Sequence, residues 1–236
     1  MKNVFMYIIL ALLFTTPSYA QRSIKVPSRF VETRPPATPS KAWHRLNASN
    51  KEFRVRNLEG ALEIKHARPM NWTHLSISGG ILKGVNYGEF GGSLTFTPDD
   101  NSQQPVEIKT GNVLFIFTLH NKIYFIEGLT HMSINRGALY ELSRDGAHFT
   151  YKQLLDFDDA PEALAIYKDQ LLIAGYSSFY IVNNFKNETI FKQTFWAGLY
   201  PNSIAAFDDE NVFIGMRGGI VKLDLIKRAM VFYKND

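Results

Sequence analysis

The chain has 236 residues, of which 45% are hydrophobic and none is cysteine, and its formal net charge is +4. This length and apolar content suffice for one domain with its own hydrophobic core. The lack of cysteine excludes disulfide staples, thiol catalysis and a lipid anchor attached through a cysteine.

The first twenty residues have the pattern of an export signal. Lys2 precedes an unbroken apolar run over residues 4–14, and Ser18-Tyr19-Ala20 offers the small residues that a signal peptidase needs. A run of eleven apolar residues is shorter than the roughly 20 that span a bilayer. We therefore expect cleavage after Ala20 and a periplasmic or secreted protein without a membrane-spanning segment. An exported chain without cysteine favours a bacterial envelope.

Residues 21–42 are expected to form a basic, proline-rich linker that is extended and unpacked, because four prolines fall in a stretch with few large apolar residues. The formal charge of residues 21–70 is +7, whereas that of residues 71–236 is −4. Such an arm could contact an anionic membrane, a wall polymer or nucleic acid. Its positive residues are dispersed, which favours a solvated leader, so no nucleic-acid partner is expected.

Residues 43–236 are expected to form the folded domain, and its sequence is repetitive. The segment from Pro161 through Asp169 to Gly175 recurs forty residues later from Pro201 through Asp209 to Gly215. Weaker copies precede it, and four glycines mark one position in each copy. These glycines are separated by 44, 47 and 40 residues along the chain, and they are Gly84, Gly128, Gly175 and Gly215.

Each repeat contains four short runs rich in Val, Ile, Phe and Tyr, separated by turn residues. In the last repeat these runs cover about residues 202–207, 211–216, 219–224 and 228–234, and no sustained helical periodicity appears after residue 21. Four strands in 40–50 residues resemble a blade of the broad β-propeller superfamily, which includes WD40-like and NHL-like repeats. The resemblance implies an all-β fold: a small β-propeller of four to five four-stranded blades. A β-sandwich is the alternative fold.

Residues 53–65 contain one or two further strands that could join the last blade or begin a partial fifth blade. In either arrangement, an N-terminal strand that pairs near the C-terminus would close the propeller and protect its open edges.

Motifs for known chemistry are missing. The six histidines are dispersed, and the acidic clusters fall where turns are expected, so we expect no metal and no cofactor. There is no G-x-S-x-G elbow, and the glycines at positions 88, 91 and 92 lie between two strands instead of before a helix. The sequence therefore identifies no catalytic residue.

A ligand site is expected on one face of the propeller. The loops between second and third strands, and those between blades, emerge together around the channel mouth and carry aromatic, acidic and basic side chains. The aromatic side chains of Tyr87, Phe90 and Trp196 could instead pack between blades. The predicted ligand-binding residues are Tyr87, Glu89, His131, Arg136, Glu162, Tyr176, Tyr200, Asn202 and Arg217.

These features favour a non-enzymatic binding or scaffold module of the bacterial envelope, with a protein or glycan ligand. The alternative is a propeller-based periplasmic hydrolase or lyase that acts on a sugar or lactone, with Glu89, Glu162, His131 and Arg217 at the channel mouth and paired carboxylates as acid and base.

Overall fold

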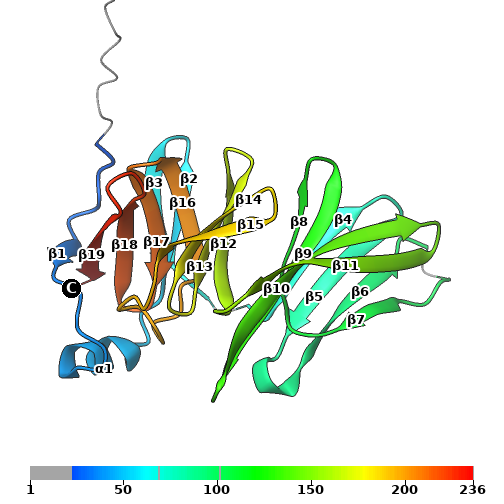
Figure 1. Cartoon of the computed structure of the whole chain (residues 1–236), viewed down its shortest axis with the longest axis horizontal. Coiled ribbons are helices and arrows are strands. Elements are labelled where there is room, and N and C mark those ends of the chain that lie inside the picture. The colour runs from blue at the N-terminus through cyan, green and yellow to red at the C-terminus, as the bar shows by residue number, and fades with distance from the viewer. Residues whose placement is uncertain (1–22, 69, 101, 236) are drawn as a thin grey trace, which may run out of the picture.

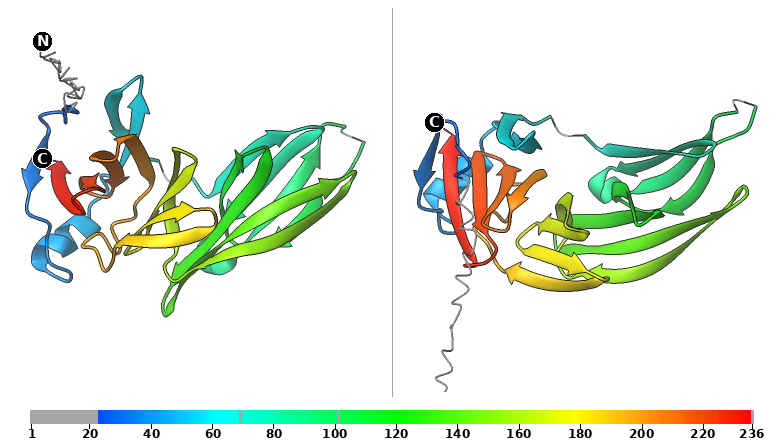
Figure 2. Two further views of the ribbon diagram at one scale, coloured as in Figure 1. Left: turned by 45° about the horizontal axis from the view of Figure 1, so that its top comes forward. Right: turned by 90° about the horizontal axis from the view of Figure 1, so that it is seen from above.

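The computed structural model describes residues 23–235 except Pro69 and Asn101, so the predicted export signal over residues 1–20 lies outside the described residues. The described chain is almost entirely β, with nineteen strands in five antiparallel sheets, one short α-helix and one 3-10 helix. The sheets stand side by side along the long axis of the molecule (Figure 1). Seen from above, they follow one another along a curved path (Figure 2).

Each repeat forms one sheet in which neighbouring strands are also consecutive in the chain. The first sheet contains β4 (Trp72–Ile77), β5 (Gly80–Asn86), β6 (Gly92–Pro98) and β7 (Val106–Thr110). The second contains β8 (Val113–Leu119), β9 (Lys122–His131), β10 (Ile134–Asp145) and β11 (His148–Phe157). The third contains β12 (Pro161–Tyr167), β13 (Gln170–Gly175), β14 (Phe179–Asn183) and β15 (Lys186–Phe191). The fourth contains β16 (Ser203–Asp208), β17 (Asn211–Met216), β18 (Gly219–Asp224) and β19 (Ala229–Asn235). The prediction of an all-β chain with repeated four-stranded units is confirmed.

The N-terminal segment differs from the expected unpacked linker. Strand β1 (Phe30–Thr33) pairs with β19 and makes the last sheet five-stranded. Phe30 is buried against Phe53, and the partly buried Ile24 and Val26 pack against the same cluster. These apolar side chains bury surface against the last sheet and the hairpin. Part of the segment over residues 21–42 therefore belongs to the folded core.

Two further elements lie between this strand and the first sheet. Helix α1 (Lys41–Asn47) begins after Ser40, whose hydroxyl accepts a hydrogen bond from the Trp43 N–H, a common way to cap a helix. The Trp43 indole donates to the carbonyl of Phe195, which holds the helix against the last two sheets. Strands β2 (Phe53–Leu58) and β3 (Ala61–His66) form a two-stranded hairpin whose β2 packs against the last sheet. No described helix is long and apolar enough to cross a membrane.

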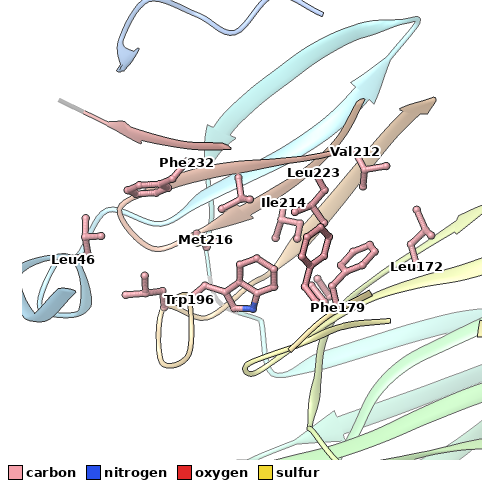
Figure 3. Packing of buried hydrophobic residues seen from close by; sticks show 14 residues of the cluster. Leu46, Leu172, Phe179, Trp196, Val212, Ile214, Met216, Leu223 and Phe232 are labelled. Atoms are coloured by element: carbon pink, nitrogen blue, oxygen red, sulfur yellow. The ribbon is translucent and has the colours of Figure 1, made fainter. Parts of the chain in front are cut away.

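The hydrophobic core is divided into four clusters, and each lies between neighbouring sheets. The largest joins the third and fourth sheets through Phe179, Trp196, Ile214 and Phe232, with Leu46 of α1 at its margin (Figure 3). Similar clusters join the first sheet to the second, and the second to the third. The fourth cluster joins the last sheet to β1 and the β2–β3 hairpin. Every sheet therefore buries apolar side chains against its neighbour, as blades of a propeller do.

The repeated glycines lie in the second strand of each sheet, where atoms of a neighbouring segment approach too closely for a side chain. A side chain on Gly84 would collide with Val113 of the second sheet, and one on Gly128 would collide with Leu114 and crowd Pro161 of the third. A side chain on Gly215 would collide with the carbonyl of Phe53 in β2. The hairpin thus abuts the fourth sheet at the position where each of the first two sheets meets the sheet that follows it.

Candidate functional site

A cavity of about 500 Å³ lies where the first strands of the five sheets meet. Its wall draws on the β2–β3 hairpin and on the beginnings of β4, β8, β12 and β16. The lining includes both charged and aromatic side chains. They are Glu52, Arg54, Arg68, Trp72, Phe115, Glu162, Tyr200, Asn202 and Arg217, with Ala67, Met70, Thr73, Leu114 and Pro201 between them.

Glu162 lines this cavity and is the second residue of β12. Its Oε2 atom is buried and has no hydrogen-bond partner in the described structure. Burial raises the pKa of Glu162 to about 8, and the charges of Asp159 and Glu52 add to the rise. The carboxyl group therefore keeps its proton at neutral pH and can both donate and accept a hydrogen bond. A buried polar atom without a partner costs free energy, so a ligand that pairs with it gains affinity.

Asn202 presents a second unpaired group to the same cavity. Its Oδ1 accepts a hydrogen bond of 2.9 Å from the Ser203 hydroxyl, whereas its buried Nδ2 has no partner in the described structure. Asn202 and Glu162 thus offer the cavity one amide donor and one neutral carboxyl group. Because both residues line one cavity, their unpaired groups suit a ligand that carries hydroxyl groups.

Arg217 and Tyr200 form the wall beside Asn202. The guanidinium group of Arg217 lies over the Tyr200 ring at 4.4 Å from its centroid and pairs with Glu52 at 2.7 Å. Tyr200 has a φ of 53°, in the left-handed region that is strained for a large side chain. Tyr200 remains 46% exposed, and Trp72, which lines the same cavity, is 44% exposed. Two accessible aromatic faces in a concave site are typical of a binding surface.

A second cavity of about 440 Å³ adjoins the first, and Leu114, Glu162 and Tyr200 line both. Tyr176 and His131 also line it, and burial raises the pKa of the Tyr176 phenol, with the charge of Glu162 next in effect. His131 Nε2 lies 2.9 Å from Glu89 Oε2, so these two side chains contact each other at the rim. We refer to these two adjoining cavities together as the hollow.

The structure brings six of the nine predicted residues to this hollow, namely His131, Glu162, Tyr176, Tyr200, Asn202 and Arg217. Glu89 contacts the hollow's rim through His131, and Tyr87 is exposed on the neighbouring loop without lining either cavity. Arg136 faces away from the hollow. It lines a different cavity, between the first and second sheets, where Lys109 and Glu127 form an ion pair of 2.8 Å.

Sequence reasoning missed the N-terminal contribution to the site. Glu52, Arg54, Arg68 and Trp72 all line the first cavity. Glu52, Arg54 and Arg68 come from the hairpin and the connections beside it, which lie outside the repeats, whereas Trp72 begins β4, whose repeat has only a weak copy of the pattern. Trp196, which could have been a ligand contact, is fully buried instead, and its indole donates to the Gly175 carbonyl.

Asp159 supports the loops beneath the site. Its buried carboxylate accepts hydrogen bonds from Asn135 Nδ2 at 2.6 Å and from the Ser177 N–H at 2.8 Å. These contacts tie the β9–β10 hairpin to the β13–β14 loop and fix the connection that leads into Glu162. Within the described part of the chain, no group of three or more histidine or acidic side chains is placed to hold a metal ion.

The comparisons with known proteins do not identify a function for this site. No model of a protein family matches the chain, and no curated protein matches it either. The functional argument therefore rests on the geometry of the hollow.

Proposed function

We propose that the protein is an exported β-propeller of the bacterial envelope in which the β2–β3 hairpin serves as a reduced fifth blade. Two observations support this architecture. The hairpin abuts Gly215 as later sheets abut Gly84 and Gly128, and one cavity is lined from all five sheets by their first strands or by the residues just before them. The pairing of β1 with β19 holds the N-terminal strand on the last blade. The pattern of residues 1–20 supports export.

Within that architecture, the protein acts as a binding module for a glycan, without catalysing a reaction. One observation carries this proposal. Glu162 and Asn202, whose Oε2 and Nδ2 atoms are buried without a hydrogen-bond partner, line the same cavity as the partly exposed residues Tyr200 and Trp72. Sugar hydroxyl groups both donate and accept hydrogen bonds, and the apolar faces of sugar rings pack on aromatic side chains. Both requirements are met here by side chains that the fold holds in place.

The test is a titration of the mature chain with a panel of oligosaccharides from bacterial walls and capsules, followed by calorimetry or NMR. A binder from the panel should lose at least tenfold in affinity with Asn202→Ala or Tyr200→Ala, because each removes a contact inside the cavity. Lys152→Ala, on an exposed strand of the second sheet, is the matched control and should bind normally. If no saccharide binds, or if the cavity variants bind like the control, the proposal is wrong.

The second candidate is a hydrolase or lyase for a sugar or lactone, and one observation favours it. A carboxyl group with a pKa of about 8 is protonated at neutral pH, as a general acid must be. Glu162→Gln separates the two functions. The amide is neutral and keeps one donor and one acceptor, so binding should survive, whereas proton transfer would be lost. Turnover of a panel saccharide or lactone that disappears in this variant would identify an enzyme.

A further inference from the structure

Another cavity lies between the N-terminal segment, helix α1 and the last sheet, and its volume is about 550 Å³. Its apolar surface comes from Pro36, Ala42, Leu46 and Phe232. Its basic side chains are Arg34, Arg45, Lys51 and Lys234, and the remaining lining residues are Thr33, Ser49, Gly218 and Asn235. No acidic side chain belongs to the described lining. We call this cavity the basic pocket.

The basic side chains come from three separate elements that the fold brings together. Arg34 directly follows β1, Arg45 lies in the last turn of α1, and Lys234 belongs to β19. The antiparallel pairing of β1 with β19 places Thr33 opposite Phe232, so Arg34 directly follows a residue that lies beside the C-terminal strand. Arg45 in the last turn of α1 also interacts favourably with the helix dipole. That interaction does not require other basic residues nearby. Four basic residues from separate segments of the chain thus line one cavity, and the local structure of each segment does not require this.

Several basic side chains elsewhere on the molecule have an acidic neighbour. Arg56 and Lys65 both contact Glu63, and Lys168 contacts Asp209. By contrast, the charged groups of Arg34, Arg45 and Lys234 make no hydrogen bond or ion pair with the part of the chain that the structure describes. Lys51 Nζ donates to Asn235 Oδ1 at 3.2 Å, so it is held at the rim. The charges of Arg34, Arg45 and Lys234 are thus not neutralised by an ion pair with a described residue.

We propose that the basic pocket binds a single anionic lipid, with the phosphate head at the arginine and lysine rim and the start of the acyl chain over Leu46 and Phe232. Arginine and lysine pair strongly with phosphate oxygens, and the apolar surface gains free energy when hydrocarbon covers it. A volume of about 550 Å³ lies within the size range of small-molecule sites. This site is separate from the central hollow, and the inference does not depend on the glycan proposal.

The experiment uses the full mature chain and dodecyl phosphate below its critical micelle concentration, with binding measured by calorimetry. The double variant Arg45→Glu/Lys234→Glu should bind at least tenfold more weakly, and added salt should weaken the wild-type interaction. The matched control is Lys83→Glu/Lys152→Glu. It makes the same change in net charge at exposed strand positions outside the pocket and should bind like the wild type. The milder Arg45→Gln/Lys234→Gln variant should give an intermediate loss.

Two further ligands test the two halves of the pocket. Inorganic phosphate should bind far more weakly than dodecyl phosphate, because it lacks the chain. Dodecyl maltoside should also bind weakly, because it lacks the charge. The proposal is overturned if either ligand binds as tightly as dodecyl phosphate, or if both pocket variants melt at the wild-type temperature and bind dodecyl phosphate normally. Loss of binding in the control variant as well would show a general charge effect and would equally overturn it.

Discussion

The guanidinium group of Arg217 lies 2.7 Å from Oε1 of Glu52, although 165 residues separate them in the chain. The same guanidinium donates to the backbone carbonyl of Asn47 at 2.8 Å. The turn between β17 and β18 is thereby fastened to the segment that connects α1 with β2. Because both side chains also line the central cavity, this ion pair links the packing of the N-terminal hairpin to the shape of the candidate site.

The first prediction concerns this pair. The two side chains are only 23% and 15% exposed, so removal of one partner leaves a poorly solvated charge behind. Arg217→Ala and Glu52→Ala should each lower the free energy of unfolding by about 2 kcal/mol, with a coupling energy of about 1 kcal/mol or more in a double-mutant cycle. Urea denaturation measures these quantities. The control cycle is Arg228 with Glu188, which are 58% and 62% exposed and should couple by less than about 0.5 kcal/mol. Equal coupling in the two cycles would contradict the structure.

The second prediction concerns strand β1. Phe30 is 4% exposed, and its ring centroid lies 5.0 Å from that of Phe53 in an edge-to-face arrangement. Phe30→Ala should cost about 3 kcal/mol and lower the melting temperature by several degrees. Val31→Ala is the control, since Val31 on the same strand is 45% exposed and should cost well under 1 kcal/mol. A chain that begins at residue 35 should melt lower still, because it exposes the edge of β19. If the truncated chain melts at the wild-type temperature, strand β1 does not contribute to the stability of the folded domain.

The contrast between this strand and the repeats shows what the sequence could predict. The last repeat was predicted to contain strands near 211–216 and 219–224, and the structure has them at Asn211–Met216 and Gly219–Asp224. A repeated pattern offers four examples of each signal, whereas β1 is a single strand of four residues flanked by prolines. Its only signal was the short apolar series that ends at Phe30.

The residues of the candidate site likewise fall into a predictable group and an unpredictable group. Glu162 and Asn202 were predicted because they lie in connections from one blade to the next, and such connections emerge on one face of a propeller. Glu52 and Arg54 could not be predicted, because their place depends on how an unrepeated hairpin packs against the last sheet. Arg136 was predicted on the right hairpin, but alternation along β10 turns it toward the first sheet, whereas Asn135 points to Asp159.

The third prediction concerns Asp159. Asp159→Ala removes the acceptor of Asn135 Nδ2 and of the Ser177 N–H, and it leaves these groups without a partner beneath the site. We expect a loss of about 2–4 kcal/mol in the free energy of unfolding. The exposed neighbour Asp158 offers the control, since Asp158→Ala should change stability by less than about 0.5 kcal/mol. Hydrogen exchange at Ser177 should accelerate in the first variant alone. If both variants are equally stable, Asp159 does not hold these loops.

The last prediction concerns the proton on Glu162. The folded protein keeps this proton up to a pKa of about 8, whereas the unfolded chain releases it near 4.5. Between these values the folded state binds more protons than the unfolded state, so this group makes the free energy of unfolding fall as pH rises. The slope is at most about 1.4 kcal/mol per pH unit, and it vanishes below 4.5 and above 8.

Glu162→Gln removes this titration while it keeps a neutral side chain of similar size. The stability of the variant relative to the wild type should therefore increase steadily from about pH 5 to pH 8 and stay constant above that range. Because every other titrating group is present in both proteins, its contribution cancels in the difference. Urea denaturation at several pH values supplies the two curves. A difference that does not change with pH would mean that Glu162 is ionised in the folded protein, and the neutral donor on which the glycan proposal relies would be absent.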